Sequence, residues 1–188
     1  GVPAAPSGLV ATAVSSAQID TTWADNSANE TGFKLYRSTD GVNFFRTATL
    51  GANVTTYSDT GRPASTTFYY RVVAYNAEGN SADSNTVAAT TFPPATVKPA
   101  APTGLVAVAL SGTQIRLTWA DNSTNEDSFR IDRSADGVSF TQVFKTGANA
   151  TTHTDTGLTS GRTYFYRIRA SNDAGNSAYS NTASARTP

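Results

Sequence analysis

The sequence contains no cysteine and a single histidine, His153. A chain without cysteine has no disulfide framework, no thiolate nucleophile and no zinc–thiolate site. No residue pattern completes a catalytic triad around the histidine. The pair of carboxylates that glycoside hydrolysis needs is not indicated either, because Asp40, Asp59 and their repeats fall in turns. We therefore expect neither enzymatic activity nor a cofactor.

Charge is also scarce. Lysine and arginine number 14, aspartate and glutamate number 14, and charged residues make up only 15% of the chain. A neutral chain lacks the electrostatic footprint of a nucleic-acid-binding protein. No apolar run is long enough to span a bilayer, no signal peptide starts at Gly1, and methionine is absent. We expect no membrane insertion, and the chain reads as a piece of a longer protein.

The sequence repeats itself at an offset of 96 residues. The stretch from Trp23 to Ser38 returns as Trp119 to Ser134, and about half of the positions between 6–91 and 102–187 are identical. This period is far longer than that of a solenoid repeat, roughly 20–50 residues. The sequence predicts two copies of one domain, at residues 1–92 and 102–188. Residues 93–101 form a proline-rich linker that favours polyproline II.

Alternating hydrophobic residues predict strands rather than helices. Gln18 to Trp23 places isoleucine, threonine and tryptophan on one face, and Phe68 to Ala74 is the longest alternating run. Asp40-Gly41 and Asp136-Gly137 are typical of hairpin turns. About seven short strands with turn signals every 8–12 residues describe an all-β, two-sheet sandwich in each copy.

These residues resemble the fibronectin type III family. The second strand ends in a lone tryptophan, an aromatic residue opens the third, and the run from Tyr164 to Gly175 reads Tyr-x-Tyr-Arg-Ile-x-Ala-x-Asn-x-x-Gly. The wording Trp-x-Asp-Asn-Ser-x-Asn-Glu is similar to the bacterial branch, found in secreted polysaccharide-degrading enzymes and surface proteins. The resemblance implies two tandem immunoglobulin-like sandwiches whose structural residues are Trp23, Trp119, Phe33, Phe129, Tyr70, Tyr164 and Tyr166.

The family's tyrosine corner is expected in one copy only. Its hydroxyl bonds to backbone upstream of the sixth strand. Tyr164 has the required place, six residues after Leu158, whereas the first copy has Phe68 and Arg62 there. A lost hydrogen bond is worth about 0.5–1.5 kcal/mol net. We therefore predict that the first domain is the less stable one.

Two surfaces are candidates for binding. The loop of Asp25, Asn26, Asn29 and Glu30, with its repeat at 121–127, offers hard oxygen atoms for calcium, but its spacing is not that of a calcium loop. The loop is better interpreted as a turn that bonds its own backbone.

The second surface is the outward face of the third and sixth strands in domain 1, with Tyr36, Tyr69, Val73 and Tyr75, and Phe45 beside them. Exposed aromatic rings suit sugar stacking or a protein partner. The alternative is cross-strand pairing without any ligand.

We expect a non-catalytic, monomeric tandem that acts as a spacer between modules of a larger secreted bacterial protein. The resemblance implies that this parent is a polysaccharide-degrading enzyme. The expected partners are the neighbouring modules. The alternative is a module that binds carbohydrate or a surface protein through Tyr36, Tyr69, Tyr75 and Phe45.

Overall fold

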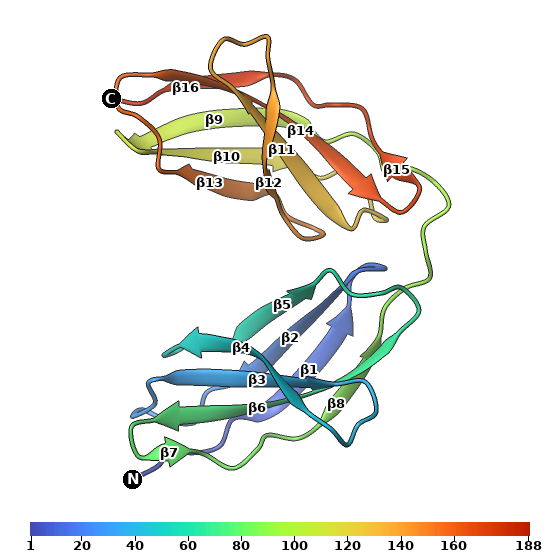
Figure 1. The fold of residues 1–188 in the computed structure, drawn as a ribbon, viewed down its shortest axis with the longest axis vertical. Coiled ribbons are helices and arrows are strands. Elements are labelled where there is room, and N and C mark those ends of the chain that lie inside the picture. The colour runs from blue at the N-terminus through green and yellow to red at the C-terminus, as the bar shows by residue number, and fades with distance from the viewer. The chain divides into compact units, whose positions relative to one another are not determined.

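The computed structural model describes residues 1–188, which form β-strands joined by turns and loops (Figure 1). None of its elements is a helix of the length and hydropathy that a membrane crossing requires. The strands of domain 1 are β1 (Ser7–Ala13), β2 (Gln18–Ala24), β3 (Gly32–Ser38), β4 (Phe45–Gly51), β5 (Thr56–Thr60), β6 (Thr67–Asn76), β7 (Gly79–Asn80) and β8 (Val87–Thr90). Those of domain 2 are β9 (Thr103–Ser111), β10 (Gln114–Ala120), β11 (Ser128–Ser134), β12 (Thr141–Lys145), β13 (Thr152–Thr156), β14 (Thr163–Asn172), β15 (Gly175–Asn176) and β16 (Ala183–Arg186).

Each domain is a sandwich of two antiparallel sheets. In domain 1 one sheet has the order β1-β2-β5, and the other has the order β4-β3-β6-β7, with β8 also paired to β6. Domain 2 repeats both sheets with β9 to β16. The predicted all-β fold with two sandwiches is confirmed. The edge strands β4 and β5 belong to different sheets, so an open edge lies between them.

The last strand of each domain is interrupted. Both β7 and β8 pair with β6, and between them the hydroxyls of Ser81 and Ser84 accept hydrogen bonds from the amides of Ala74 and Val72 at 3.0 and 3.1 Å. The serine side chains thus continue the bonding of β6 where regular pairing stops. Counted as one element, β7 and β8 complete the seven strands that the sequence predicts.

The predicted inward faces form the two cores. Ile19, Thr21 and Trp23 are buried on β2, and Phe68, Tyr70, Val72 and Ala74 are buried on β6. The tryptophan ring packs on the first aromatic residue of the next strand, 5.7 Å from Phe33 in domain 1 and 5.6 Å between Trp119 and Phe129 in domain 2. Tyr164 and Tyr166 are buried with them. All seven residues expected to be structural lie in the cores.

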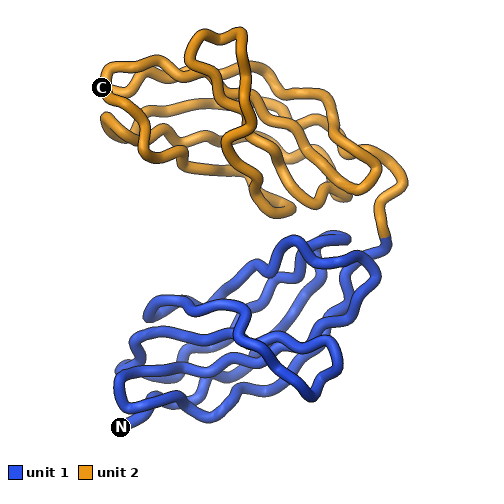
Figure 2. Tube along the Cα trace, in the orientation of Figure 1, with its two compact units in different colours: residues 1–93 blue, residues 94–188 orange.

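The chain divides into two compact units, residues 1–93 and 94–188 (Figure 2). Part of the stretch expected to be a linker is bound to domain 2. The carbonyl oxygen of Val97 accepts hydrogen bonds from the side-chain amides of Asn125 at 2.9 Å and Asn172 at 2.8 Å, and Asn122 bonds the carbonyl of Ala101. At the other end, Phe92 is tied to domain 1 by two backbone bonds. Residues 93–96 are the stretch that lies between these ties.

Candidate functional site

The three tyrosines of the predicted binding surface lie on one face of the β3–β6 pair. Tyr36 is opposite Arg71, while Tyr69 is opposite Ser38 and Tyr75 is opposite Gly32. Tyr69 and Tyr75 are six residues apart on β6, which separates them by roughly 20 Å at the rise of a strand. All three side chains are half-buried. The structure therefore places them on one face but does not bring their rings together.

Cations cover two of these rings. The Lys34 ammonium lies 4.4 Å from the centre of the Tyr75 ring. The Arg71 guanidinium lies 4.3 Å from the Phe44 ring and 5.8 Å from the Tyr36 ring, and it forms an ion pair with Asp83 at 2.9 Å. Contacts of this kind stabilise an exposed sheet face without any ligand.

Two residues expected on this surface are not exposed on it. Val73 faces the same way as Tyr75 but is only 4% exposed. Phe45 is opposite Arg37, whose side chain reaches Asp59 on the other side of the sheet. A bulge between Leu35 and Tyr36 shifts the register of β4, so the aromatic residue near Tyr36 is Phe44 and the expectation for Phe45 was wrong.

Domain 2 builds the same arginine arrangement with two partners exchanged. Arg167, the counterpart of Arg71, lies 4.4 Å from the Phe140 ring and 3.9 Å from the Tyr179 ring. Its carboxylate partner is Asp132, at 3.3 Å, and the hydroxyl of Tyr179 donates to the same carboxylate at 2.8 Å. In domain 1 the tyrosine is on the third strand and the aspartate follows the sixth strand. In domain 2 the aspartate is on the third strand and the tyrosine follows the sixth. The difference between Tyr36 and Asp132 therefore belongs to a matched structural set.

The oxygen-rich loop holds the start of each domain. The Asp25 carboxylate accepts a bond from the amide of Ser27, and the Ser27 hydroxyl donates to Glu30 at 2.5 Å and lowers the pKa of that carboxyl. The amides of Asn26 and Asn29 reach back to the carbonyls of Ala5 and Gly1. No group of three or more histidine, cysteine, aspartate or glutamate residues has a geometry that holds a metal ion. The side chains of this loop are engaged in structural bonds.

His153 stacks on Phe144 between the edge strands β12 and β13. Their ring centres are 3.9 Å apart and the planes differ by 19°. Burial lowers the pKa of the imidazole, and the charge of Asp155 opposes that shift. The Asp155 carboxylate is itself bound to Arg133 and to the hydroxyl of Tyr166. This arrangement packs the histidine and provides no nucleophile for it.

The tyrosine corner is present in domain 2 as predicted. The Tyr164 hydroxyl accepts a hydrogen bond from the amide of Thr159 at 3.1 Å. In domain 1 the equivalent residues are Phe68 and Pro63. Proline has no N–H, so the missing hydroxyl leaves no donor without an acceptor.

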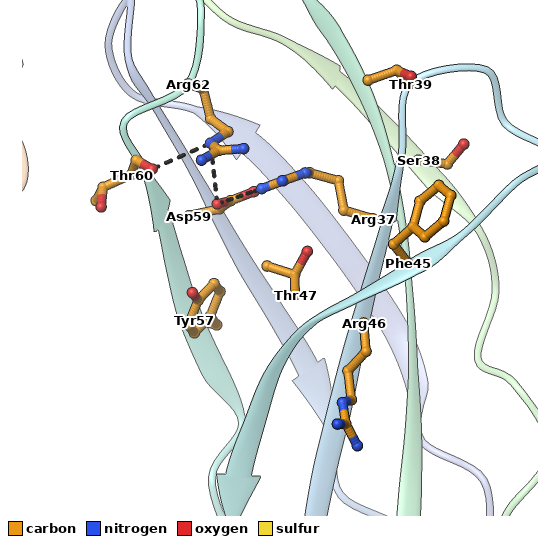
Figure 3. A pocket seen from close by; sticks show the side chains of 10 residues that line it. All are labelled: Arg37, Ser38, Thr39, Phe45, Arg46, Thr47, Tyr57, Asp59, Thr60 and Arg62. Carbon is orange, nitrogen blue, oxygen red and sulfur yellow. Dashed lines mark hydrogen bonds and ion pairs between the residues drawn. The ribbon is translucent and has the colours of Figure 1, made fainter.

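Both domains contain a buried carboxylate bound by arginine and tyrosine. In domain 1 Asp59 accepts two bonds from Arg37, at 2.9 and 2.7 Å, and one from the Tyr70 hydroxyl at 2.8 Å. Burial raises the pKa of Tyr70, and the charge of Asp59 raises it further. Domain 2 repeats this set with Arg133, Asp155 and Tyr166. Domain 1 adds Arg62, and a hollow of about 410 Å³ opens beside it (Figure 3). No pattern in the sequence predicted this hollow.

Comparison with known proteins identifies the domain type. Residues 100–186 match the model of the fibronectin type III domain. Domain 1 repeats the strand order of domain 2 and about half of its sequence. The second domain thus belongs to the fibronectin type III family, and the chain is a tandem of such sandwiches. The resemblance predicted from the tryptophan and tyrosine motifs is confirmed.

Three similar proteins from bacteria carry names of polysaccharide-degrading enzymes. Exoglucanase B of Cellulomonas fimi is 37% identical over 147 residues, which cover 72% of this chain and 13% of that protein. Chitinase A1 of Niallia circulans is 32% identical over 197 residues, covering 98% and 26%. Alpha-amylase of Niallia circulans is 36% identical over 93 residues, covering 48% and 7%. The chain spans at most 26% of the length of these relatives.

Solved structures with similar folds include two animal tandems. The chicken CNTN1 FN1–FN3 domains have a TM-score of 0.44 and 20% identity, covering 98% of this chain and 68% of that one. A two-domain fibronectin type III segment of chicken tenascin has a TM-score of 0.43 and 16% identity, covering 97% and 99%.

Proposed function

We propose that this chain is a non-catalytic spacer that separates and orients neighbouring modules of a larger extracellular bacterial protein that degrades a polysaccharide. The observation that carries the proposal is the joint between the domains. Two compact sandwiches leave residues 93–96, half of them proline, between the last tie to one domain and the first tie to the next. A short proline-rich joint limits the separations that two modules can adopt.

Two further observations support this function. The relatives are named as enzymes that act on glucans and chitin, and this chain matches only a fraction of each. The carboxylates and the histidine of this chain are bound in structural pairs or turns. We expect the isolated chain to be monomeric, and its partners to be the modules on either side.

The test is a replacement in the full-length protein that contains this chain. One variant lacks the pair, and a second carries a flexible glycine–serine segment of similar span. We expect both variants to hydrolyse insoluble polysaccharide more slowly and soluble oligosaccharide at an unchanged rate. A fall in the soluble rate would assign the pair a role in catalysis or folding. Full activity of the flexible variant would contradict the orienting role.

Binding of neutral polysaccharide through Tyr36, Tyr69 and Tyr75 is the second candidate. The half-exposure of all three rings on one sheet face supports it, because flat aromatic rings that reach solvent can stack on sugar rings. A pull-down on insoluble cellulose, chitin and xylan tests it with the whole chain and with Tyr36→Ala/Tyr75→Ala. Retention that the substitutions abolish would support this candidate, and absence of retention on all three would contradict it.

A further inference from the structure

The hollow of domain 1 lies at the open edge of the sandwich, between β4 of one sheet and β5 of the other (Figure 3). Its volume of about 410 Å³ is within the range of small-molecule sites, roughly 300–1,000 Å³. Phe45, Arg46 and Thr47 line it from β4, and Tyr57 and Asp59 line it from β5. We call it the β4–β5 cleft.

The β4–β5 cleft carries an excess of positive charge in a chain whose net charge is zero. Three arginines line it, Arg37, Arg46 and Arg62, against one carboxylate, Asp59. That carboxylate is only 3% exposed and already accepts both bonds from Arg37. The Nε of Arg62 lies 3.4 Å from Asp59, while Arg46 forms no ion pair and points along the strand away from this cluster. The lining thus has two more positive than negative charges, with Arg62 at the cluster and Arg46 at the rim.

An aromatic ring, that of Phe45, also lines the cleft. Phe45 is 74% exposed, although large apolar side chains are usually sheltered from water. It is opposite Arg37 on the neighbouring strand and lines the same cleft. An exposed ring of this kind offers a flat apolar face, on which the C–H face of a sugar can pack.

Domain 2 retains the frame of this region and changes the cleft. Its arginine–aspartate–tyrosine set is the same, but Gln142 and Leu158 replace the two arginines, and Thr141 replaces the exposed phenylalanine. The ring of Phe144, which stands where domain 1 has Ala48, stacks on His153 between the edge strands. The arginines and the exposed ring are therefore not required by the fold.

We propose that the β4–β5 cleft binds a uronic-acid residue of an acidic polysaccharide. Arg62 contacts the carboxylate, with Arg46 at the rim, because guanidinium groups recognise carboxylates through paired, charge-assisted hydrogen bonds. Phe45 packs against the sugar ring. This site goes beyond the spacer function and does not depend on it, because a spacer needs neither the arginines nor the exposed ring.

The test is a titration of the whole 15N-labelled chain with trigalacturonate, followed by NMR. We expect shift changes confined to β4, β5 and the Arg62 loop. Arg46→Gln/Arg62→Leu should weaken binding by about tenfold or more, and Phe45→Thr by a smaller factor. These substitutions introduce residues that domain 2 already has in the same frame, so the fold should persist. Arg116→Gln, which removes an exposed charge on β10, is the matched control and should leave the affinity unchanged.

Two other ligands test which chemical groups the cleft recognises. Equal affinity for neutral cellotriose would overturn the role of the arginines, and equal affinity for triglutamate would overturn the role of the sugar ring. Shifts outside the cleft, or binding that survives Arg46→Gln/Arg62→Leu, would overturn the site itself. Failure on any of these grounds leaves the spacer function untouched, because that function is measured on insoluble polysaccharide in the full-length protein.

Discussion

At the scale of single residues, some differences between the two domains involve two interacting positions that change together. The tyrosine corner is an example, because domain 1 lacks the acceptor on Phe68 and also the donor on Pro63. Removing both partners of a hydrogen bond costs far less than removing one. The missing hydrogen bond therefore no longer gives a physical reason for the prediction that domain 1 is the less stable domain.

We predict that Tyr164→Phe lowers the free energy of unfolding of domain 2 by about 1 kcal/mol, because the Thr159 amide loses its acceptor. Phe68→Tyr should give domain 1 no comparable gain, because Pro63 has no N–H to donate. Urea unfolding of the whole chain, read from assigned NMR amides of each domain, measures both. A gain in domain 1 equal to the loss in domain 2 would contradict this account.

His153 makes the stability of domain 2 sensitive to mild acid. Its pKa in the folded state is lowered by burial from the ordinary value of 6.5, so the folded state favours the neutral ring. The unfolded chain then binds the proton first, and stability present above pH 6.5 is lost as the pH falls toward the folded-state pKa. His153→Tyr, which introduces the residue of domain 1, should remove this loss. Thermal melts of both chains between pH 8 and pH 5 test it, and an unchanged pH profile in the variant would count against it.

At the scale of elements, each outer sheet face is organised around one arginine on the sixth strand. Arg71 and Arg167 each lie against a phenylalanine, a tyrosine and a carboxylate. The third strand supplies the tyrosine in domain 1 and the carboxylate in domain 2, and the segment after the sixth strand supplies the other group. Because of this exchange, the presence of Tyr36 in domain 1 and its absence at the same position in domain 2 need no ligand to explain them.

We predict strong coupling between Tyr36 and Asp83. Tyr36→Asp alone places two carboxylates around Arg71 and removes a ring, and Asp83→Tyr alone removes the carboxylate. The double substitution reproduces the arrangement of domain 2 and should recover most of the loss, with a coupling free energy of about 1 kcal/mol. A double-mutant cycle in urea gives this value, and additive losses would exclude the coupling.

The strands were predictable because period-two alternation and turn residues act locally. The buried faces of β2 and β6 follow directly from that pattern. The position of Phe45 was not predictable, because a bulge in β4 changes which side chain faces outward without a distinct signal in the sequence. The β4–β5 cleft was also not predictable, because its lining comes from strands of two different sheets.

At the scale of the whole molecule, the boundary of the second domain could have been read from the repeat. Pro3-Ala4-Ala5-Pro6 returns as Pro99 to Pro102 at the same offset of 96. The prolines were interpreted as linker because proline-rich composition is typical of linkers. The structure shows that the carbonyls of Val97 and Ala101, within the proline-rich stretch 93–101, are bound by asparagines of the domain.

We predict that Asn125→Ala/Asn172→Ala lengthens the joint between the domains. Loss of the bonds to Val97 frees residues 97 and 98, as far as the buried Pro99, which adds up to about 6 Å of reach at the rise of polyproline II. Distance distributions between spin labels on the two domains should widen, and the amides of Val97 and Lys98 should exchange faster. Asn29→Ala/Asn76→Ala removes the same bonds in domain 1 and is the control. Equal widening in both variants would contradict the prediction.

The exchanged tyrosine and aspartate also bear on how the chain avoids misassembly. Neighbouring domains of such similarity are prone to swap strands while they fold. If the third strands changed places, one arginine would meet Tyr36 and Tyr179 without a carboxylate, and the other would meet Asp83 and Asp132 together. Both mismatched sheets would be less stable than the native ones. The exchange of tyrosine and aspartate thus favours pairing of each third strand with the sheet of its own domain.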